Sequence, residues 1–565
     1  MTATTVQSAP AVRGLWQRQL DHYPDTRHRM TYLAIVVLAT IMLYYQFYIP
    51  GAVAPSIIAQ FGMTFNDYVY IIVIANAIGA FGSLAAGLAD RWGRANLVAY
   101  GLVVTALLVL FGVPNATSTA AYATLFSIIG LVEGVILVAT PALVRDFSPQ
   151  LGRASAMGFW TLGPVIGSLV VAVVSSNTLS HLTAWQDQFT ICGIVGLVVA
   201  LIAIVGLREL SPGLRDQLMV SLRDRALIEA KARGLNVEDL LKRPWWQMMR
   251  LDVIGSAFAI SVFLLVYYTA VGFFTVYFTT LHGFTLSSAN SLGNWFWAFD
   301  AAALIVIGIV SDRVGVRKPF MVVGAVGAIV MTIIFLNLGT GTTFATFAIV
   351  ISFTAVFLAI AYAPWMASFT ETVEKHNPAL TATGLAVWGW IIRAVIAVSF
   401  LIMPHVVTSM TPLVTYGAQV ATLSAKYAPQ LATGAAIDPA TQAALAANPS
   451  PTNPAAIKAV TEIATAFKIS PADAQARLVA LATVPAADLA FLKAHGTDVQ
   501  NAASQASGQW KTWWWVCVGG QIVFLPLILL MAGRWSPRRA REDAAEHERK
   551  VQEELAALAD PEPAA

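Results

Sequence analysis

Charged residues are scarce in this chain. Asp, Glu, Lys and Arg make up 12% of its 565 residues, whereas 57% of the residues are hydrophobic. A soluble protein of this composition would leave much apolar surface in contact with water, so the composition indicates an integral membrane protein. Cysteine is also rare: Cys192 and Cys517 both fall in long apolar runs. We therefore expect no disulfide framework.

The chain also lacks the motifs of several enzyme classes. Its eight histidines are scattered, without the spacing of a metal site or a catalytic triad. It contains no phosphate-binding Gly-Lys-Ser/Thr loop, so ATP is not expected to power the protein directly. We expect neither an enzyme nor a cofactor requirement, and we expect no nucleic-acid partner.

Apolar runs dominate what is present. A helix that spans a bilayer needs about 20 apolar residues, and twelve runs meet this requirement. They lie at about 31–53, 66–89, 95–113, 120–144, 154–176, 187–207, 252–281, 288–310, 319–338, 344–368, 384–408 and 511–533. Most Lys and Arg residues fall in the connections on one side. By the positive-inside rule, this asymmetry predicts a multi-pass protein of the plasma membrane with both termini in the cytoplasm.

A short turn motif of an acid, a base, a glycine and a further base occurs twice. The first copy is DRWGR at residues 90–94 and the second is DRVGVR at residues 312–317. Each copy lies between two apolar runs, at the same place in each set of six. A Pro-containing segment near the end of the fourth run also recurs, as Thr140-Pro141 and Ala363-Pro364. The chain is therefore predicted to consist of two homologous halves, a common plan of membrane transporters.

The doubled turn resembles the signature loop of the major facilitator superfamily (MFS) of transporters, and through the repeat the resemblance covers nearly the whole chain. It implies an all-α protein with twelve transmembrane helices in two pseudo-symmetric bundles of six. In this family the loop latches the two halves on the cytoplasmic side. By resemblance, the gate residues are Asp90, Arg91, Gly93, Arg94, Asp312, Arg313, Gly315 and Arg317.

These features divide the chain into seven segments. They are a cytoplasmic N-terminal segment (1–30), an N-terminal bundle (31–207), a cytoplasmic linker (208–251), helices 7–11 of a C-terminal bundle (252–408), an extracytoplasmic Ala- and Pro-rich insertion (409–510), helix 12 (511–533) and a cytoplasmic tail (534–565). In the insertion, Asp438-Pro439, Asn453-Pro454 and Ser470-Pro471 predict starts of short helices, because a capping side chain precedes proline. The alternative is a largely disordered loop.

Three charged residues fall within predicted spans: Glu133, Asp300 and Arg393. A charge at the bilayer centre costs at least about 2.5–3.5 kcal/mol on insertion scales, so each is a functional candidate. A carboxylate in a medium of low dielectric can exchange a proton near neutrality, which predicts proton coupling through Glu133 or Asp300. Arg393 keeps its proton and must pair with an acid or a bound anion. The alternative is a structural ion pair between Arg393 and one of the acids.

Polar and aromatic side chains gather in the spans that line the cavity in this family. With Arg393, the predicted substrate ligands are Trp388, Tyr44, Tyr45, Gln46, Asn76, Tyr267, Tyr268 and Trp297. Each aromatic residue could instead serve packing or the membrane interface. The segment with Gly163, Pro164 and Gly167 partly resembles the antiporter motif of the family, and these residues are predicted to allow close helix packing.

The sequence thus predicts a secondary active transporter that works by alternating access and is driven by a proton gradient. The predicted substrate is a small organic solute, with an organic anion such as a carboxylate favoured by Arg393, and the protein is expected to be a monomer in the bilayer. One alternative is a proton-driven exporter of drugs or metabolites, which the Gly-Pro segment and the many aromatic residues favour. A second alternative is a transporter-like sensor with residues 409–510 as its ligand module.

Overall fold

The computed structural model describes residues 16–83, 92–148, 160–211, 214, 244–377, 381–447 and 453–559. The chain forms two compact units. The transmembrane unit consists of Met1–Val406 with Trp510–Ala565, and the insertion unit consists of Val407–Gln509. The described residues are almost all helical. The strands among the described residues are a parallel pair of two residues each, β1 (Gln19–Leu20) and β2 (Glu209–Leu210).

The transmembrane unit contains two sets of long helices. The first half consists of α1 (Thr26–Ala52), α2 (Ala54–Phe61), α3 (Phe65–Ser83), α5 (Arg94–Leu107), α6 (Thr119–Phe147), α8 (Gly163–Thr178) and α9 (Trp185–Gly206). The second half consists of α12 (Pro244–Met248), α13 (Leu251–Phe263), α14 (Leu265–His282), α15 (Leu286–Val314), α16 (Lys318–Leu336), α17 (Phe344–His376), α18 (Thr381–Val406) and the end of α25 (Ala486–Leu527). The tail helix α26 (Pro537–Ala559) follows.

Eleven helices in the described ranges are long and apolar enough to cross a membrane. The shorter α8, with 16 residues, follows the undescribed residues 149–159 and provides the twelfth crossing. This architecture confirms the predicted two sets of six. Three predicted helices differ in detail: the seventh is divided at Leu264 into α13 and α14, the third ends in a π-helical turn at Leu108–Gly112, and the twelfth is the end of the 42-residue α25.

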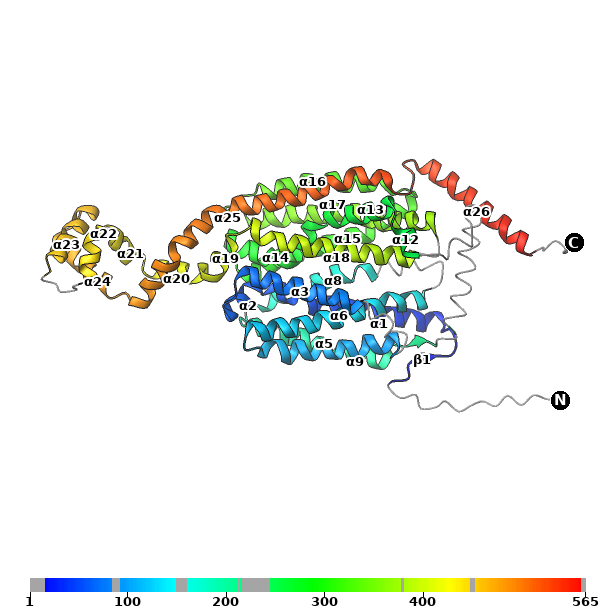
Figure 1. The fold of residues 1–565 in the computed structure, drawn as a ribbon, viewed down its shortest axis with the longest axis horizontal. Helices are drawn as coiled ribbons and strands as arrows, with labels where there is room; N and C mark the ends of the chain where they lie inside the picture. The colour runs from blue at the N-terminus through cyan, green and yellow to red at the C-terminus, as the bar shows by residue number, and fades with distance from the viewer. Residues whose placement is uncertain are drawn as a thin grey trace. The chain divides into compact units, whose positions relative to one another are not determined.

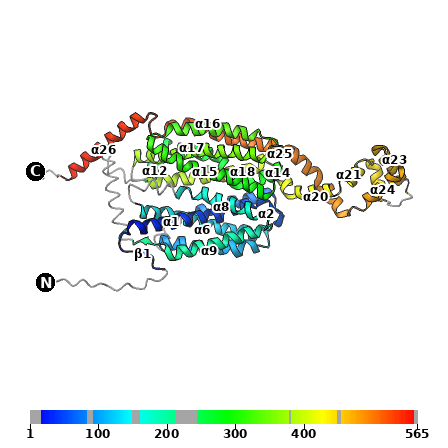
Figure 2. The same cartoon turned by 180° about the vertical axis from the view of Figure 1, so that it is seen from behind.

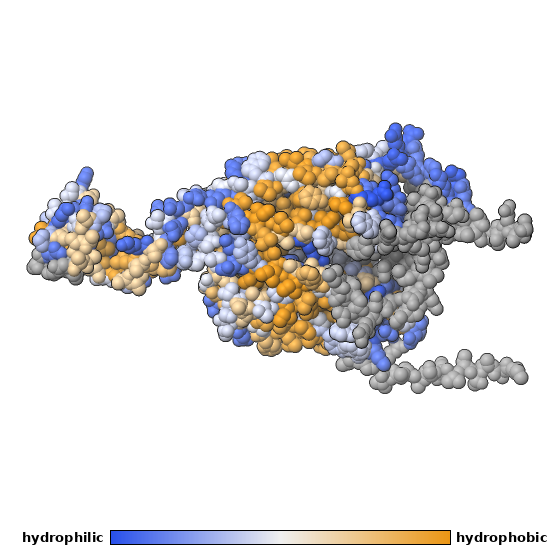
Figure 3. Space-filling model, viewed as in Figure 1, coloured by the Kyte–Doolittle hydropathy of each residue, from blue (hydrophilic) through white to orange (hydrophobic). Residues whose placement is uncertain are grey.

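The two halves form two layers, coloured blue to cyan and green to orange in Figure 1 and seen from behind in Figure 2. The end of the transmembrane unit that carries β1 and α26 is called the terminal end here, and the opposite end, where α1 and α14 finish, is called the distal end. On the face shown in Figure 3, hydrophobic residues form a broad band across the middle of the unit, with hydrophilic residues toward its ends. Such a band matches the hydrocarbon layer of a bilayer.

The halves meet along a seam where α3 lies against α18, α8 against α15 and α1 against α14. Hydrogen bonds cross the seam at the distal end. Asn290 Nδ2 donates to the Ala52 carbonyl at 2.9 Å, and Thr275 Oγ1 donates to the Gly51 carbonyl. Ser176 accepts two more, from Ser287 Oγ to its carbonyl at 2.6 Å and from Asn294 Nδ2 to its hydroxyl at 2.9 Å. The halves are therefore joined at the distal end.

The insertion unit consists of short helices. They are α19 (Met410–Pro412), α20 (Ala418–Lys426), α21 (Ala428–Ala435), α22 (Pro439–Ala447), α23 (Pro454–Phe467), α24 (Pro471–Ala482) and the beginning of α25. The three predicted helix starts are confirmed. Asn453 and Ser470 cap α23 and α24 by accepting from the amides of Ala455 and Asp473, and Asp438 accepts from the amide of Ala440 at 2.9 Å. The insertion unit contains more helices than these three starts indicate.

Candidate functional site

The three charged residues of the spans lie on three helices, of which α15 and α18 meet the first half at the seam and α6 packs against α3. Glu133 is on α6, Asp300 on α15 and Arg393 on α18, and the two acids are only 7% and 3% exposed. Glu133 belongs to the first half and interacts electrostatically with Arg393 of the second half. Among the described residues, no carboxylate lies within the 4.0 Å limit of an ion pair with Arg393. The acid and the base therefore interact through space, from opposite halves, without forming an ion pair.

Close helix packing positions Glu133. At Gly79 on α3, an added Cβ would lie 2.7 Å from the Gly130 carbonyl of α6 and 3.6 Å from Glu133 Oε2. Glycine at this position lets α3 and α6 approach each other beside the carboxylate. Because α3 in turn lies against α18, the carboxylate is close to the helix that carries Arg393.

Three tyrosines lie near Glu133 and Arg393. Tyr44 and Tyr48 of α1 and Tyr268 of α14 each interact electrostatically with Arg393. The rings of Tyr44 and Tyr48 have centroids 5.3 Å apart, one helical turn from each other. Phenolic oxygens can donate to a bound anion and accept from a guanidinium, so these three tyrosines suit a polar ligand at Arg393.

Asp300 lies in an aromatic environment. It interacts electrostatically with Tyr267 of α14 and Tyr362 of α17. Trp297, one turn before Asp300 on α15, packs against the Tyr267 ring with centroids 5.1 Å apart. Tyr362 was not identified from the sequence. The signal available was a polar aromatic residue just before Pro364, in the segment that repeats between the halves.

Two predicted ligands, Tyr45 and Gln46, lie elsewhere. Gln46 accepts a hydrogen bond from Thr105 Oγ1 at 2.7 Å, and Tyr45, 1% exposed, interacts with Cys192 of α9. Both side chains therefore lie inside the first bundle, on the side of α1 away from Arg393. Asn76 donates to the Ile72 carbonyl of its own helix at 2.8 Å.

Trp388, on α18, packs within the second half against Trp365 of α17, with ring centroids 5.4 Å apart. Trp388 also lies beside Tyr362, with ring centroids 6.5 Å apart, so it adjoins the aromatic environment of Asp300. The structure does not bring Tyr45 or Gln46 together with Arg393.

The Gly-Pro segment lies where α8 touches α1. Pro164 is in the first turn of α8. An added Cβ at Gly163 would lie 2.6 Å from Thr40 Cγ2, and at Gly167 it would lie 2.6 Å from Tyr44 Cβ. Both glycines therefore allow α8 to pack directly against the turn of α1 that presents Tyr44.

The signature turns lie at the terminal end. Asp90 and Arg91 are outside the described residues. Gly93 has φ +91°, a conformation that favours glycine. Arg94 forms an ion pair with Asp146, at the end of α6, with a distance of 2.7 Å.

The second signature turn repeats this arrangement. Gly315, with φ +76°, ends α15. Arg317 forms ion pairs with Asp312 at 2.7 Å and with Glu371, near the end of α17, at 3.3 Å. Arg313 is exposed. In both turns the described ion pairs join residues of the same half rather than residues across the seam. Asp146 and Glu371 were not identified from the sequence, although both are acids near the end of the fourth helix of a half.

A clasp of residues 16–20 and 207–211 holds the first signature turn. Arg18 is 1% exposed, donates to Asn96 Oδ1 at 2.8 Å and to the Ala203 carbonyl at 3.1 Å, and also contacts the Ile204 carbonyl. Glu209, in the paired strand β2, accepts from the Arg94 amide at 2.6 Å. The carboxylate thereby caps α5 immediately after the turn. This clasp was not anticipated from the sequence.

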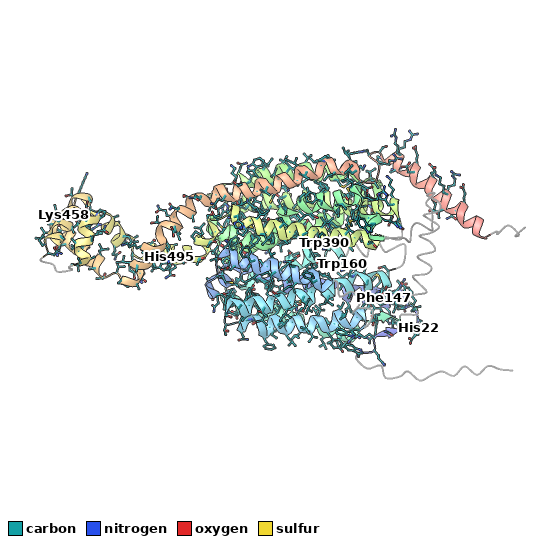
Figure 4. All side chains as sticks on the ribbon, viewed as in Figure 1. His22, Phe147, Trp160, Trp390, Lys458 and His495 are labelled. Atoms are coloured by element: carbon teal, nitrogen blue, oxygen red, sulfur yellow. The ribbon has the colours of Figure 1, made fainter. Side chains whose placement is uncertain are left out.

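Two tryptophans mark the terminal part of the seam. Trp160 of the first half and Trp390 of the second half lie near the line where the halves meet in Figure 4. The Trp160 indole donates to Thr140 Oγ1 at 3.1 Å, whereas Trp390 is 70% exposed. The Trp390 side chain therefore lies on the surface of α18, three residues before Arg393.

Comparisons with known proteins agree with this architecture. A model of the family described as Major Facilitator Superfamily matches residues 36–299. A probable anion transporter 3, chloroplastic, of Oryza sativa subsp. japonica is 23% identical over 45% of this chain and 48% of its own length. An MFS-type efflux pump of Mycolicibacterium smegmatis is 23% identical over 53% of this chain and 66% of its own. The chain spans about half the length of the curated relatives that it matches first, 41% and 48%.

A solved structure shares the fold. It is a bacterial homolog of the human lysosomal transporter Spinster in an inward-facing and occupied conformation, with a TM-score of 0.55 and 17% identity. The match covers 91% of this chain and 100% of that chain.

Proposed function

The chain belongs to the major facilitator superfamily, and from this premise we propose that it is a secondary active transporter of a small organic anion, such as a carboxylate, coupled to protons. The observation that carries the proposal is the electrostatic interaction between buried Glu133 of the first half and Arg393 of the second half, here called the charged pair. The protein is proposed to act as a monomer in the plasma membrane, with its terminal end in the cytoplasm. A proton gradient, rather than a cofactor, would supply the energy.

Coupling follows from competition for Arg393. While Glu133 is ionised, its charge partly neutralises the guanidinium and repels an incoming anion. Protonation of Glu133 removes this competitor, so a proton and an anion bind more strongly together than apart. Such a coupling free energy is typically about 1–3 kcal/mol, or about 5–150-fold in affinity. Asp300, next to Tyr267 and Tyr362, provides a second carboxylate for protons in the other half.

Alternating access requires the halves to separate at one end and join at the other. The hydrogen bonds across the seam join the halves at the distal end. In contrast, Arg94 and Arg317 form their described ion pairs with acids of their own halves. We propose that in the opposite state the distal bonds break and the terminal ends approach, with the signature turns exchanging partners across the seam.

The proposal is tested by transport in proteoliposomes that contain the full chain. With an imposed pH gradient, radiolabelled monocarboxylates should accumulate, and Arg393→Gln should reduce the initial rate to that of empty liposomes. Arg534→Gln is the matched control, because Arg534 forms an exposed ion pair with Asp543. Accumulation by Arg393→Gln at the wild-type rate would defeat the role of Arg393 as anion ligand.

A second candidate is proton-driven export of drug-like compounds. The name of the Mycolicibacterium relative and the close packing of α8 at Gly163 and Gly167 favour it. Expression of the chain in a drug-sensitive strain should then raise tolerance to amphipathic compounds. Accumulation of carboxylates without any change in tolerance would favour the first candidate.

A further inference from the structure

A buried lysine at the terminal end of the second half has no acidic partner. Lys318, the first residue of α16, is 7% exposed. Its ammonium donates to the Leu529 carbonyl at 3.4 Å and lies 5.9 Å from the centroid of the Trp535 ring. In the described part of the chain, no carboxylate comes within 4.0 Å of it. Because an ammonium has three donors and a buried charge is normally paired, Lys318 can still bind an anion.

The surroundings of Lys318 are positively charged. Lys375, near the end of α17, and Arg534 both act on it electrostatically as like charges. Arg534 is neutralised by its ion pair with Asp543, whereas Lys375 is exposed and forms no ion pair within the described ranges. The N-terminus of α16 adds a partial positive charge, and its cap residue Arg317 has no oxygen in its side chain to accept from the first amides. An anion bound here would therefore be attracted by two lysines and by the helix end.

The acids of the second signature turn do not supply this anion. Asp312 and Glu371 both form ion pairs with Arg317, at 2.7 Å and 3.3 Å. Their charge is therefore already used to neutralise the guanidinium beside Lys318. The positive charge of Lys318 and Lys375 is left for an anion from outside the chain.

The position of Lys318 favours a lipid as the source of that anion. Lys318 begins a helix that is long and apolar enough to cross a membrane, Lys318–Leu336, so its ammonium lies at the edge of the apolar span. Leu529, which accepts its hydrogen bond, is 64% exposed, and Trp535 is 49% exposed. Tryptophan is enriched at the level of the lipid headgroups, where basic pockets between helices bind anionic headgroups. A lipid can place its phosphate at Lys318 and its acyl chains against the exposed apolar side chains nearby.

We propose that Lys318, Lys375 and the start of α16 form a binding site for the phosphate headgroup of an anionic phospholipid. Lys318 donates to the phosphate from inside the protein, and Lys375 attracts it from the surface. Because the headgroup contacts both α16 and α17 beside the segment that leads to α26, its binding stabilises the terminal end of the second half. The site is separate from the charged pair, so it does not depend on the proposed substrate.

The test counts the lipids that the full-length protein retains in native mass spectrometry. The protein is equilibrated in detergent with equal amounts of phosphatidylglycerol and phosphatidylcholine that carry the same acyl chains. The wild type should retain phosphatidylglycerol about tenfold to thirtyfold more strongly, because two lysines attract its net charge. Inorganic phosphate in large excess should not displace it, since phosphate lacks the acyl chains.

Three variants locate the site. Lys318→Gln should lower the affinity for phosphatidylglycerol about tenfold, because a charged hydrogen-bond donor is lost. Lys318→Arg keeps the charge and should retain the preference for this lipid. Lys375→Gln should lower the affinity about fivefold. Lys511→Gln is the matched control, because Lys511 also lies at the edge of an apolar run but its ammonium donates to Asn337 Oδ1 at 2.7 Å, and it should bind both lipids as the wild type does.

The outcomes decide the proposal. Equal retention of the two lipids by the wild type would overturn it, and so would undiminished retention of phosphatidylglycerol by Lys318→Gln. Complete displacement by inorganic phosphate would identify a site for a soluble anion and would also overturn the lipid. If Lys318→Gln shows no cooperative melting and is therefore unfolded, the exposed Lys375 decides, and retention by Lys375→Gln at the wild-type level contradicts the site.

Discussion

Removal of the hydrogen bonds across the distal seam should open that end of the protein. The perturbation is the triple variant Ser287→Ala, Asn290→Ala and Asn294→Ala, which deletes three donors to the first half: to the Ser176 carbonyl, the Ala52 carbonyl and the Ser176 hydroxyl. The bond between Thr275 and Gly51 remains. The variant therefore weakens the closed state without changing the charged pair.

The magnitude follows from the bonds lost. A neutral hydrogen bond contributes about 1 kcal/mol net, so loss of three bonds disfavours the closed distal end by about 3 kcal/mol. Since 1.4 kcal/mol is a factor of ten, the ratio of open to closed molecules should rise about 150-fold. The single variant Asn290→Ala should raise it about fivefold by the same reasoning.

The assay is the labelling rate of a cysteine at Ala172 by a membrane-impermeant maleimide. Ala172 is 3% exposed and lines a pocket between α8 of the first half and α15 of the second half. The native cysteines, both buried, are first replaced by serine. When opening is fast, the rate is proportional to the open fraction. Asn177→Ala is the control, because the Asn177 amide donates only within α8. Labelling of the triple variant at the control rate would refute the claim that these bonds hold the seam closed.

Three further changes should have measurable effects. Arg18→Gln should lower the stability of the full chain in detergent by about 2–4 kcal/mol, because carbonyls at the end of α9 lose a charged donor; an unchanged melting temperature would contradict this. Gly167→Leu should reduce carboxylate uptake at least about tenfold by displacing Tyr44, whereas Gly389→Ala, with no atom within 4 Å of the added Cβ, serves as control. Asn453→Ala should destabilise α23 by about 1 kcal/mol, visible as faster proteolysis within the insertion unit.

The overall architecture could be predicted because it depends on local composition. The long apolar runs predicted the membrane-spanning helices, and the two signature turns predicted the two homologous halves. Glu133, Asp300 and Arg393 could be identified because charges are costly within apolar runs. Their positions beside one seam required the fold, since they come from helices far apart in the sequence.

Side-chain direction could not be read from the sequence. Tyr44 and Gln46 are neighbours on α1, yet Tyr44 interacts with Arg393 while Gln46 is bonded to Thr105 inside the bundle. Successive residues of a helix differ by about 100° in direction, so this distinction depends on the placement of α1 in the bundle. Tyr45, which interacts with Cys192 of α9, differs in direction from Tyr44 for the same reason.

Contacts between distant segments were missed as well. The clasp joins Arg18 to carbonyls near residue 203 and Glu209 to the start of α5, and no local pattern marks either residue. The start of helix 12 was placed at residue 511 because the apolar run begins there. The structure continues the helix back to Ala486, since the Ala-rich segment between Pro485 and Pro526 has high helix propensity and no internal proline.

The most direct test of the central claim, that Glu133 and Arg393 couple a proton to an anion, is the pH dependence of benzoate affinity in nanodiscs. The wild type should bind benzoate more weakly as the pH rises and Glu133 ionises, over a range of about 5–150-fold. Glu133→Gln should bind it tightly at every pH, whereas Asp187→Asn, an acid in the first turn of α9, should behave as the wild type. An equally strong pH dependence in Glu133→Gln would contradict the account.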